Sequence, residues 1–194
     1  NLFSREAVER GALENYVSQK GIFALTVDEA FLRELESWRE MLVKNIAIYN
    51  TSLNARQLNM AVQRTIDRIV FLRICEDRNI ERYGKLKAQL RKNIYQELLG
   101  LYQQADDKYN SGLFYLSDAA EHPIADTVSK KIIVGDDPLR KIINNLYYPY
   151  SPYEFSVFPA DILGQVYERF LGKVIELSEN RAVEIVEKPE VRKA

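Results

Sequence analysis

One predicted helix, residues 55–78, constrains the fold more than any other part of the sequence. Five aliphatic side chains recur along one face of it at helical spacing: Leu58, Val62, Ile66, Ile69 and Val70. Phe71 and Cys75 fall on the opposite side, beside Arg64 and Arg68. A helix that is apolar on two sides is usually packed between other helices. The sequence therefore predicts a helical bundle with this segment near its centre.

Periodic apolar residues and start signals predict further helices around it. These helices cover residues 3–19, 28–48, 84–91, 93–109 and 138–146, and a last one begins at Pro159. The expected N-caps are Asn54, Asn93, and either Asp136 or Asp137. Near the C-terminus, β-branched runs at 173–177 and 182–187 flank a short polar turn, which predicts a hairpin. The expected fold is therefore mainly α: a multi-helix bundle with a small C-terminal β-hairpin.

The charge balance argues against a dedicated nucleic-acid-binding domain. The 194 residues include 27 Lys and Arg against 28 Asp and Glu, for a formal net charge of −1, whereas such domains are usually strongly basic. A local basic patch within a larger assembly stays compatible with this balance. The only cysteine, Cys75, and the only histidine, His122, cannot build a disulfide or a zinc site. With no signal peptide or bilayer-length apolar stretch in the sequence, we expect a cytoplasmic protein without a membrane partner.

Arg73 projects from the middle of the main apolar face of the 55–78 helix. Glu76 and Asp77 follow three and four residues later, within reach of its guanidinium. The sequence therefore predicts a structural ion pair of Arg73 with Glu76 and Asp77, which would fix packing more than it stabilises. The functional alternative is that Arg73 reaches a phosphate or a neighbouring domain.

Catalytic motifs are present only in incomplete form. Asp106-Asp107-Lys108 matches the short signature of metal-dependent nucleases, but it lies at a predicted helix end without a partner strand. Ser151-Pro152-Tyr153 imitates the adenine methyltransferase tetrapeptide with one proline too few. The β-like run that leads into Gly135 has a single glycine, far short of a cofactor-binding loop. His122 is expected in a solvated loop and Cys75 in the core. We therefore expect no catalytic, cofactor-binding or metal-binding residues in this chain.

Two weaker patterns are compatible with a nucleic acid. An aromatic loop contains Tyr147, Tyr148, Tyr150, Tyr153, Phe155 and Phe158. These rings either stack on extruded bases or pin the loop to the core. The candidate contacts to a DNA backbone are Arg64, Arg68, Lys188, Arg192 and Lys193, together with Arg56, Arg91 and Lys92. Basic residues on solvated helix faces have the same pattern, so both interpretations stay open.

Several stretches resemble type IIG restriction–modification enzymes. The run Ala61–Arg78 is similar to the central helix of their helical connector, and Asp107–Phe114 resembles the same proteins. The run Ser151–Ile175, with Pro159-Ala160-Asp161-Ile162-Leu163-Gly164 and Phe170-Leu171-Gly172, also matches. The end, Glu187–Lys193, is similar to the approach to their methyltransferase domain. Together these stretches span most of the chain from residue 28 onward.

The resemblance implies a non-catalytic connector between an endonuclease and an adenine-N6 DNA methyltransferase. It divides the chain into a lead-in at 1–27, a connector domain at 28–158, and a last helix with hairpin at 159–194. S-adenosylmethionine and Mg²⁺ are implied for the parent enzyme, whose reactive residues would lie before Asn1 and after Ala194. DNA and the two flanking domains are the implied partners, and the isolated piece is expected to self-associate. A stand-alone helical protein-interaction module unrelated to DNA is the alternative.

Overall fold

The computed structural model describes residues 27–116, 126–151, 153–178 and 180–188. Within these ranges lie the α-helices α3 (Val27–Tyr49), α4 (Ala55–Asp77), α5 (Ile94–Tyr109), α6 (Asp136–Asn145) and α7 (Ala160–Leu171). A short 3₁₀ helix, η1 (Lys87–Gln89), precedes α5, and the strands β1 (Lys173–Leu177) and β2 (Val183–Glu187) follow α7. The mainly α class and the C-terminal hairpin are thus confirmed. The helix expected at 3–19 lies outside the described residues.

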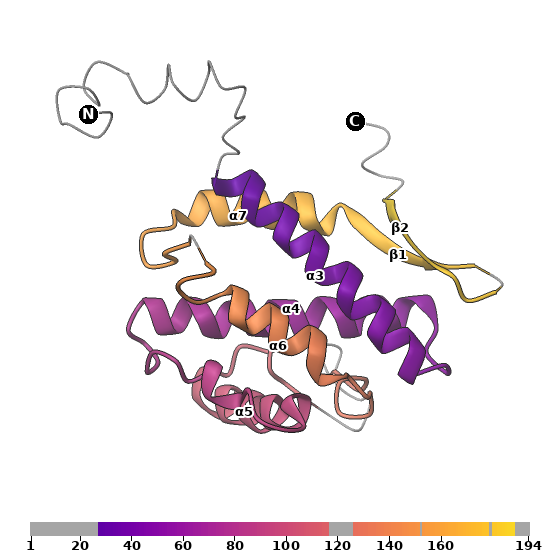
Figure 1. The fold of residues 1–194 in the computed structure, drawn as a ribbon, viewed down its shortest axis with the longest axis horizontal. Helices are drawn as coiled ribbons and strands as arrows, with labels where there is room; N and C mark the ends of the chain where they lie inside the picture. The colour runs from indigo at the N-terminus through magenta and orange to yellow at the C-terminus, as the bar shows by residue number, and fades with distance from the viewer. Residues whose placement is uncertain (1–26, 117–125, 152, 179, 189–194) are drawn as a thin grey trace, which may run out of the picture.

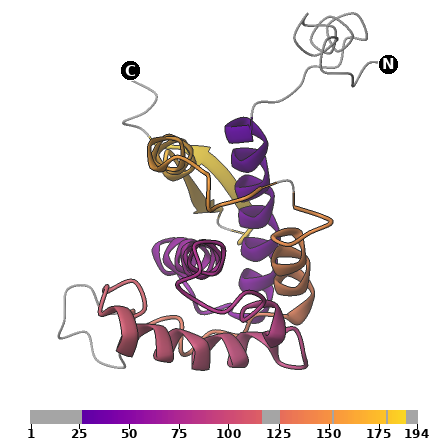
Figure 2. The same ribbon diagram turned by 90° about the vertical axis from the view of Figure 1, so that its left-hand side faces the viewer.

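Helix α4 lies at the centre of the arrangement (Figure 1). Seen along its axis, it has α7 on one side and α5 on the other, while α3 and α6 pack beside it (Figure 2). Aromatic contacts explain the side that faces α5, because the ring centroid of Phe71 lies 5.3 Å from Tyr109 and 5.4 Å from Phe114. The two apolar sides predicted for this helix are therefore both used in packing.

Local capping fixes where two of the helices begin. Asn54 caps α4 as predicted: its Oδ1 accepts from the Gln57 backbone N–H at 2.9 Å, and Gln57 Oε1 accepts from Asn54 N–H at 3.1 Å. Helix α5 differs from expectation, because Asn93 is left-handed and makes no side-chain cap. Instead the Asp136 carboxylate accepts from the backbone N–H groups of Asn93 and Ile94. Gly135, rather than an aspartate, is the N-cap of α6.

The C-terminal hairpin is attached to the helices through a side-chain amide. β1 and β2 pair antiparallel, with Ile175 opposite Ile185. Asn59 of α4 donates to the Ile175 carbonyl at 2.6 Å and accepts from the Ile175 N–H at 2.8 Å. The amide thus supplies the two bonds that a neighbouring strand would make. The run at 131–134 that seemed β-like in sequence forms no strand, and its backbone is held at Ile133 by the Asn50 side chain.

One hydrophobic cluster connects the helices and the hairpin, reaching from Phe31 of α3 to Ile175 of β1. Three rings of the segment before α7 pack on Phe31: Tyr153, Phe155 and Phe158, at centroid distances of 5.1, 5.5 and 5.9 Å. The last helix therefore shares the core of α3, and the domain boundary predicted at residue 158 stays a prediction. In the described ranges no helix is long and apolar enough to cross a membrane.

Arg39 of α3 connects this helix to the end of α7. Its side chain is 3% exposed, and it donates to the carbonyls of Phe170 at 2.7 Å and Lys173 at 3.2 Å. The guanidinium also lies 3.7 Å from the centre of the Phe170 ring. Burial lowers the pKa of Arg39 to about 10, so the group is charged at neutral pH. A cation at this position suits the negative end of the α7 dipole.

Replacing Arg39 with Met keeps a long apolar side chain but removes the donor to both carbonyls. We expect the Arg39→Met free energy of unfolding to fall by about 2–4 kcal/mol, because buried acceptors lose their partner. Urea denaturation measures the change. The matched control is Arg33→Met on the same helix, where the side chain is exposed and the expected change is within about 0.5 kcal/mol. Equal effects of the two substitutions would contradict this role of Arg39.

Candidate functional site

The structure brings Arg73, Glu76 and Asp77 together in the last turns of α4. Arg73 Nη1 pairs with Asp77 Oδ1, while Glu76 Oε2 lies 4.0 Å away. Arg73 Nε also donates to the carbonyl of Leu146, the residue that ends α6, at 2.9 Å. The guanidinium lies 4.4 Å from the centre of the Tyr147 ring. All of these contacts are internal, so Arg73 is in position to hold α4 to α6 rather than to reach a phosphate.

Glu76 and Asp77 extend this cluster to two separate loops. Glu76 accepts from the backbone N–H groups of Gly84 at 2.8 Å and Leu86 at 2.7 Å, and from the Tyr147 hydroxyl at 2.7 Å. Asp77 Oδ2 accepts from the Phe155 N–H at 3.0 Å. We call Arg73, Glu76, Asp77 and Tyr147 the Arg73 cluster. It fixes the loop after α4 and the aromatic loop after α6 to the same helix end.

Arg68 is not a surface residue, and its prediction as a DNA contact is wrong. Its side chain is 0% exposed, and Nη2 lies 2.8 Å from Asp126 Oδ2. Arg68 also donates to the Leu113 carbonyl at 2.8 Å and to Ser129 Oγ at 3.0 Å. Burial raises the pKa of Asp126, but hydrogen bonds from Ser129 and the charge of Arg68 bring it below its ordinary value. Arg68 lies on the second apolar side of α4, which is packed against other parts of the chain. This packing explains why a residue predicted to be at the surface is buried.

Of the other predicted DNA contacts, Arg64 is half-buried on α4 and Lys188 is half-buried just after β2. Arg192 and Lys193 lie outside the described residues, as does His122. The contacts of Arg64 and Lys188 with DNA stay predictions. Sequence reasoning missed Arg39 and Asp126. The sequence does not indicate a partner for Arg39, because Arg39 bonds to backbone carbonyls, which every residue has. Asp126 is not recognisable as the partner of Arg68 because the two residues are 58 positions apart.

The residues that partly match catalytic motifs have structural roles or surroundings typical of a helix surface or core. Asp106, Asp107 and Lys108 lie on the last turn of α5, and Lys108 Nζ bonds to Glu81 Oε1 at 2.6 Å. Cys75 is 4% exposed, and burial raises the pKa of its thiol. Throughout the described part of the chain, no group of three or more His, Cys, Asp and Glu side chains is arranged to hold a metal ion.

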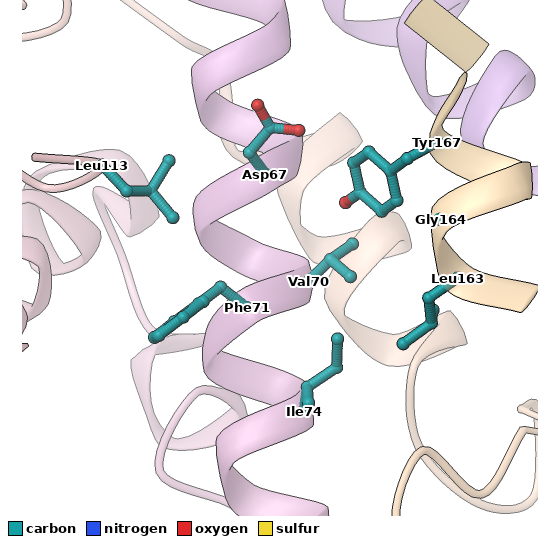
Figure 3. Close-up of a pocket in the computed structure, with 8 residues that line it drawn as sticks. All are labelled: Asp67, Val70, Phe71, Ile74, Leu113, Leu163, Gly164 and Tyr167. Atoms are coloured by element: carbon teal, nitrogen blue, oxygen red, sulfur yellow. The ribbon is translucent and has the colours of Figure 1, made fainter. Parts of the chain in front are cut away.

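An open apolar hollow lies between α4 and α7 (Figure 3). Its volume is about 390 Å³, and Leu163 and Tyr167 of α7 face Val70 and Ile74 of α4 across it (Figure 3). Asp67 is at one end, and burial raises the pKa of this carboxyl to about 6. Burial likewise raises the pKa of the Tyr167 hydroxyl. Exposed apolar walls of this kind suit contact with another apolar surface.

The comparison with known proteins agrees with the resemblance seen in the sequence. The chain is 36% identical over 192 residues to the type II restriction enzyme and methyltransferase RM.Eco57I of Escherichia coli. The chain is a relative of one segment of that enzyme. The match covers 98% of this chain but 18% of the enzyme. The resemblance to fused restriction and methyltransferase enzymes is thus confirmed. No protein-family model matches the chain, and no solved structure matches it significantly.

Glu76→Gln tests the Arg73 cluster. In the parent, three donors bond to the two carboxylate oxygens of Glu76. A glutamine has only one acceptor oxygen, so at least one buried N–H or O–H group loses its partner. We expect the free energy of unfolding to fall by about 2–4 kcal/mol, as measured by urea denaturation. Glu154→Gln is the control, since Glu154 is exposed and should change stability by less than about 0.5 kcal/mol. A Glu76→Gln protein as stable as the parent would refute the structural role.

Asp67→Asn tests the raised pKa beside the hollow. A carboxyl with a higher pKa in the folded state binds more protons when folded, so stability falls as pH rises from the ordinary carboxyl range to about 6. Asparagine removes this loss, and we expect roughly 1–2 kcal/mol more stability at neutral pH. Denaturation at a series of pH values measures it, with the exposed Asp107→Asn as control. A destabilised Asp67→Asn protein at neutral pH would contradict the assigned direction.

Proposed function

We propose that this chain is the non-catalytic helical connector of a type IIG restriction–modification enzyme. In this proposal it holds an endonuclease domain and an S-adenosylmethionine-dependent adenine-N6 methyltransferase domain at a fixed separation on DNA. The last helix and hairpin, residues 159–187, would abut the methyltransferase domain. The partners are then DNA and the two flanking domains, the location is cytoplasmic, and the isolated piece self-associates through surfaces that these domains cover.

The match to one segment of RM.Eco57I is the observation that carries this proposal. The relative is named as a restriction enzyme and a methyltransferase, and this chain aligns with 18% of its length. In this proposal, Mg²⁺ and S-adenosylmethionine belong to the parent enzyme. The buried Arg39, Arg68 and Arg73 favour a rigid spacer, because each ties a helix to a distant part of the chain.

Activity assays on plasmid DNA test the proposal directly. We expect the 194-residue chain, given Mg²⁺ and labelled S-adenosylmethionine, neither to nick the plasmid nor to transfer methyl groups. The full-length enzyme that carries the chain serves as positive control. In that enzyme, the Asp106→Ala/Asp107→Ala pair should leave cleavage unchanged, because both side chains lie in the last turn of α5 and belong to no group of three or more metal-ligating side chains among the described residues.

Two results would overturn the connector. The first is nicking or methyl transfer by the chain alone, abolished by the same pair of substitutions. The second is a full-length protein with neither activity, which would favour the stand-alone protein-interaction module instead. The open apolar hollow between α4 and α7 is the feature that such a module would use.

A further inference from the structure

The near-neutral chain concentrates its positive charge in one short segment. Residues 78–92 contain one acid, Glu81, and six basic residues: Arg78, Arg82, Lys85, Lys87, Arg91 and Lys92. Their net charge is +5, while the other 179 residues contain 21 basic and 27 acidic residues, a net charge of −6. The formal charge of −1 therefore conceals a strong asymmetry, and its positive part lies between α4 and α5.

The single acid of this segment is already engaged. Glu81 accepts from Lys108 at 2.6 Å, from the Tyr109 hydroxyl at 2.6 Å and from Lys85 at 3.0 Å. Burial acts to raise the pKa of Glu81, but these hydrogen bonds bring it down to about 2. Lys85 is thus the one basic residue of the segment with an ion pair in the described part of the chain. The side chains of Arg78, Arg82, Lys87, Arg91 and Lys92 are all exposed.

Side chains from α4 and α6 hold the backbone of this segment in place. The Arg73 cluster bonds the N–H groups of Gly84 and Leu86 through Glu76. Arg140 of α6 donates to the carbonyls of Leu90 and Arg91 at 2.9 and 2.8 Å. The exposed cations therefore project from a fixed backbone, and binding a partner would cost less ordering entropy than for a flexible basic tail.

Exposed tyrosines border the same surface. The segments 78–92 and 147–151 lie at one end of the molecule (Figure 1), and the ring of Tyr83 contacts that of Tyr147 at a centroid distance of 5.6 Å. Tyr83, Tyr148 and Tyr150 are 59%, 83% and 70% exposed. Arg82, Tyr83 and Lys85 also line a hollow of about 480 Å³, together with Glu81. We call residues 78–92 with Tyr148 and Tyr150 the basic face.

We propose that the basic face binds the sugar–phosphate backbone of duplex DNA without reading its sequence. Lys and Arg release condensed counterions when they neutralise phosphates, and tyrosine hydroxyls also donate to phosphate oxygens. The assignment to DNA rests on the proposed function, because an anionic membrane would attract the same charges. It leaves out Arg68, which is buried, keeps the candidate contacts Arg91 and Lys92, and adds the other exposed cations beside the Arg73 cluster.

Binding to a short fluorescent duplex of random sequence, followed by anisotropy over a series of salt concentrations, tests the face. The test variant of the full 194-residue chain carries four substitutions: Arg82→Gln, Lys87→Gln, Arg91→Gln and Lys92→Gln. The control removes four exposed cations elsewhere: Arg33→Gln, Lys44→Gln, Lys131→Gln and Arg169→Gln. Both variants have the same net charge, so a difference between them reports position rather than total charge.

We expect the test variant to bind at least about tenfold more weakly than the parent, and the slope of log affinity against log salt to shrink by about 0.9 for each lost phosphate contact. The control should lose less than about threefold. Circular dichroism checks that both variants fold. If the fourfold variant does not fold, the Arg91→Gln/Lys92→Gln pair gives the same comparison against Arg33→Gln/Lys44→Gln.

Three outcomes would overturn the basic face: no binding of duplex by the parent chain, equal losses in the two variants, or binding to phosphatidylserine vesicles without binding to DNA. These outcomes differ from failure of the connector proposal. If the chain has no enzymatic activity and does not bind DNA, the connector proposal stands and the basic-face proposal fails. A chain that cleaves or methylates DNA and binds it through these cations loses the connector and retains the face.

Discussion

Three buried guanidinium groups determine how the helices of this chain are joined. Arg39, Arg68 and Arg73 donate to the carbonyls of Phe170, Leu113 and Leu146, each far away in sequence. Two of these carbonyls belong to the last turn or the C-cap of a helix, where backbone acceptors lack intrahelical partners. A planar guanidinium serves several such acceptors at once and remains charged when buried. Apolar packing supplies the bulk of the burial, and these bonds select one arrangement of the helices.

The buried arginines affect the positions of the helices more than the net stability of the fold. Burying a cation carries a desolvation cost that its partners largely offset, so such groups contribute modestly to net stability while their removal is costly. Their acceptors, which include backbone carbonyls, lie at defined places, and a helix that slides by one turn loses them. For the proposed spacer, the consequence is a fixed separation between the two ends of the bundle. The hairpin, tied to α4 by the Asn59 amide, takes part in the same rigid unit.

Much of this structure can be predicted from local sequence patterns, but contacts between residues far apart in the sequence cannot. The helix at 55–77, the N-cap at Asn54 and the approach of Asp77 to Arg73 all follow from local sequence patterns. The partner of Arg68 is 58 residues away, and Arg39 bonds to carbonyls, which every residue has. Asp136 caps α5 instead of its own helix for the same reason. An arginine within an apolar stripe is the local sign of such a buried group, and among the three arginines it predicts a partner only for Arg73, whose acids follow three and four residues later.

The Arg73 cluster connects the interior to the basic face. The Glu76 carboxylate lies close to the Arg73 guanidinium in the interior. It also accepts hydrogen bonds from two backbone N–H groups of the loop that carries the exposed cations. Tyr147 donates to the same carboxylate, and its two neighbours along the loop, Tyr148 and Tyr150, are exposed. Charges on a fixed backbone act over about one Debye length, roughly 8 Å at physiological salt. For the proposed basic face, the +5 of this segment therefore matters more to an approaching anionic partner than the −1 of the whole chain.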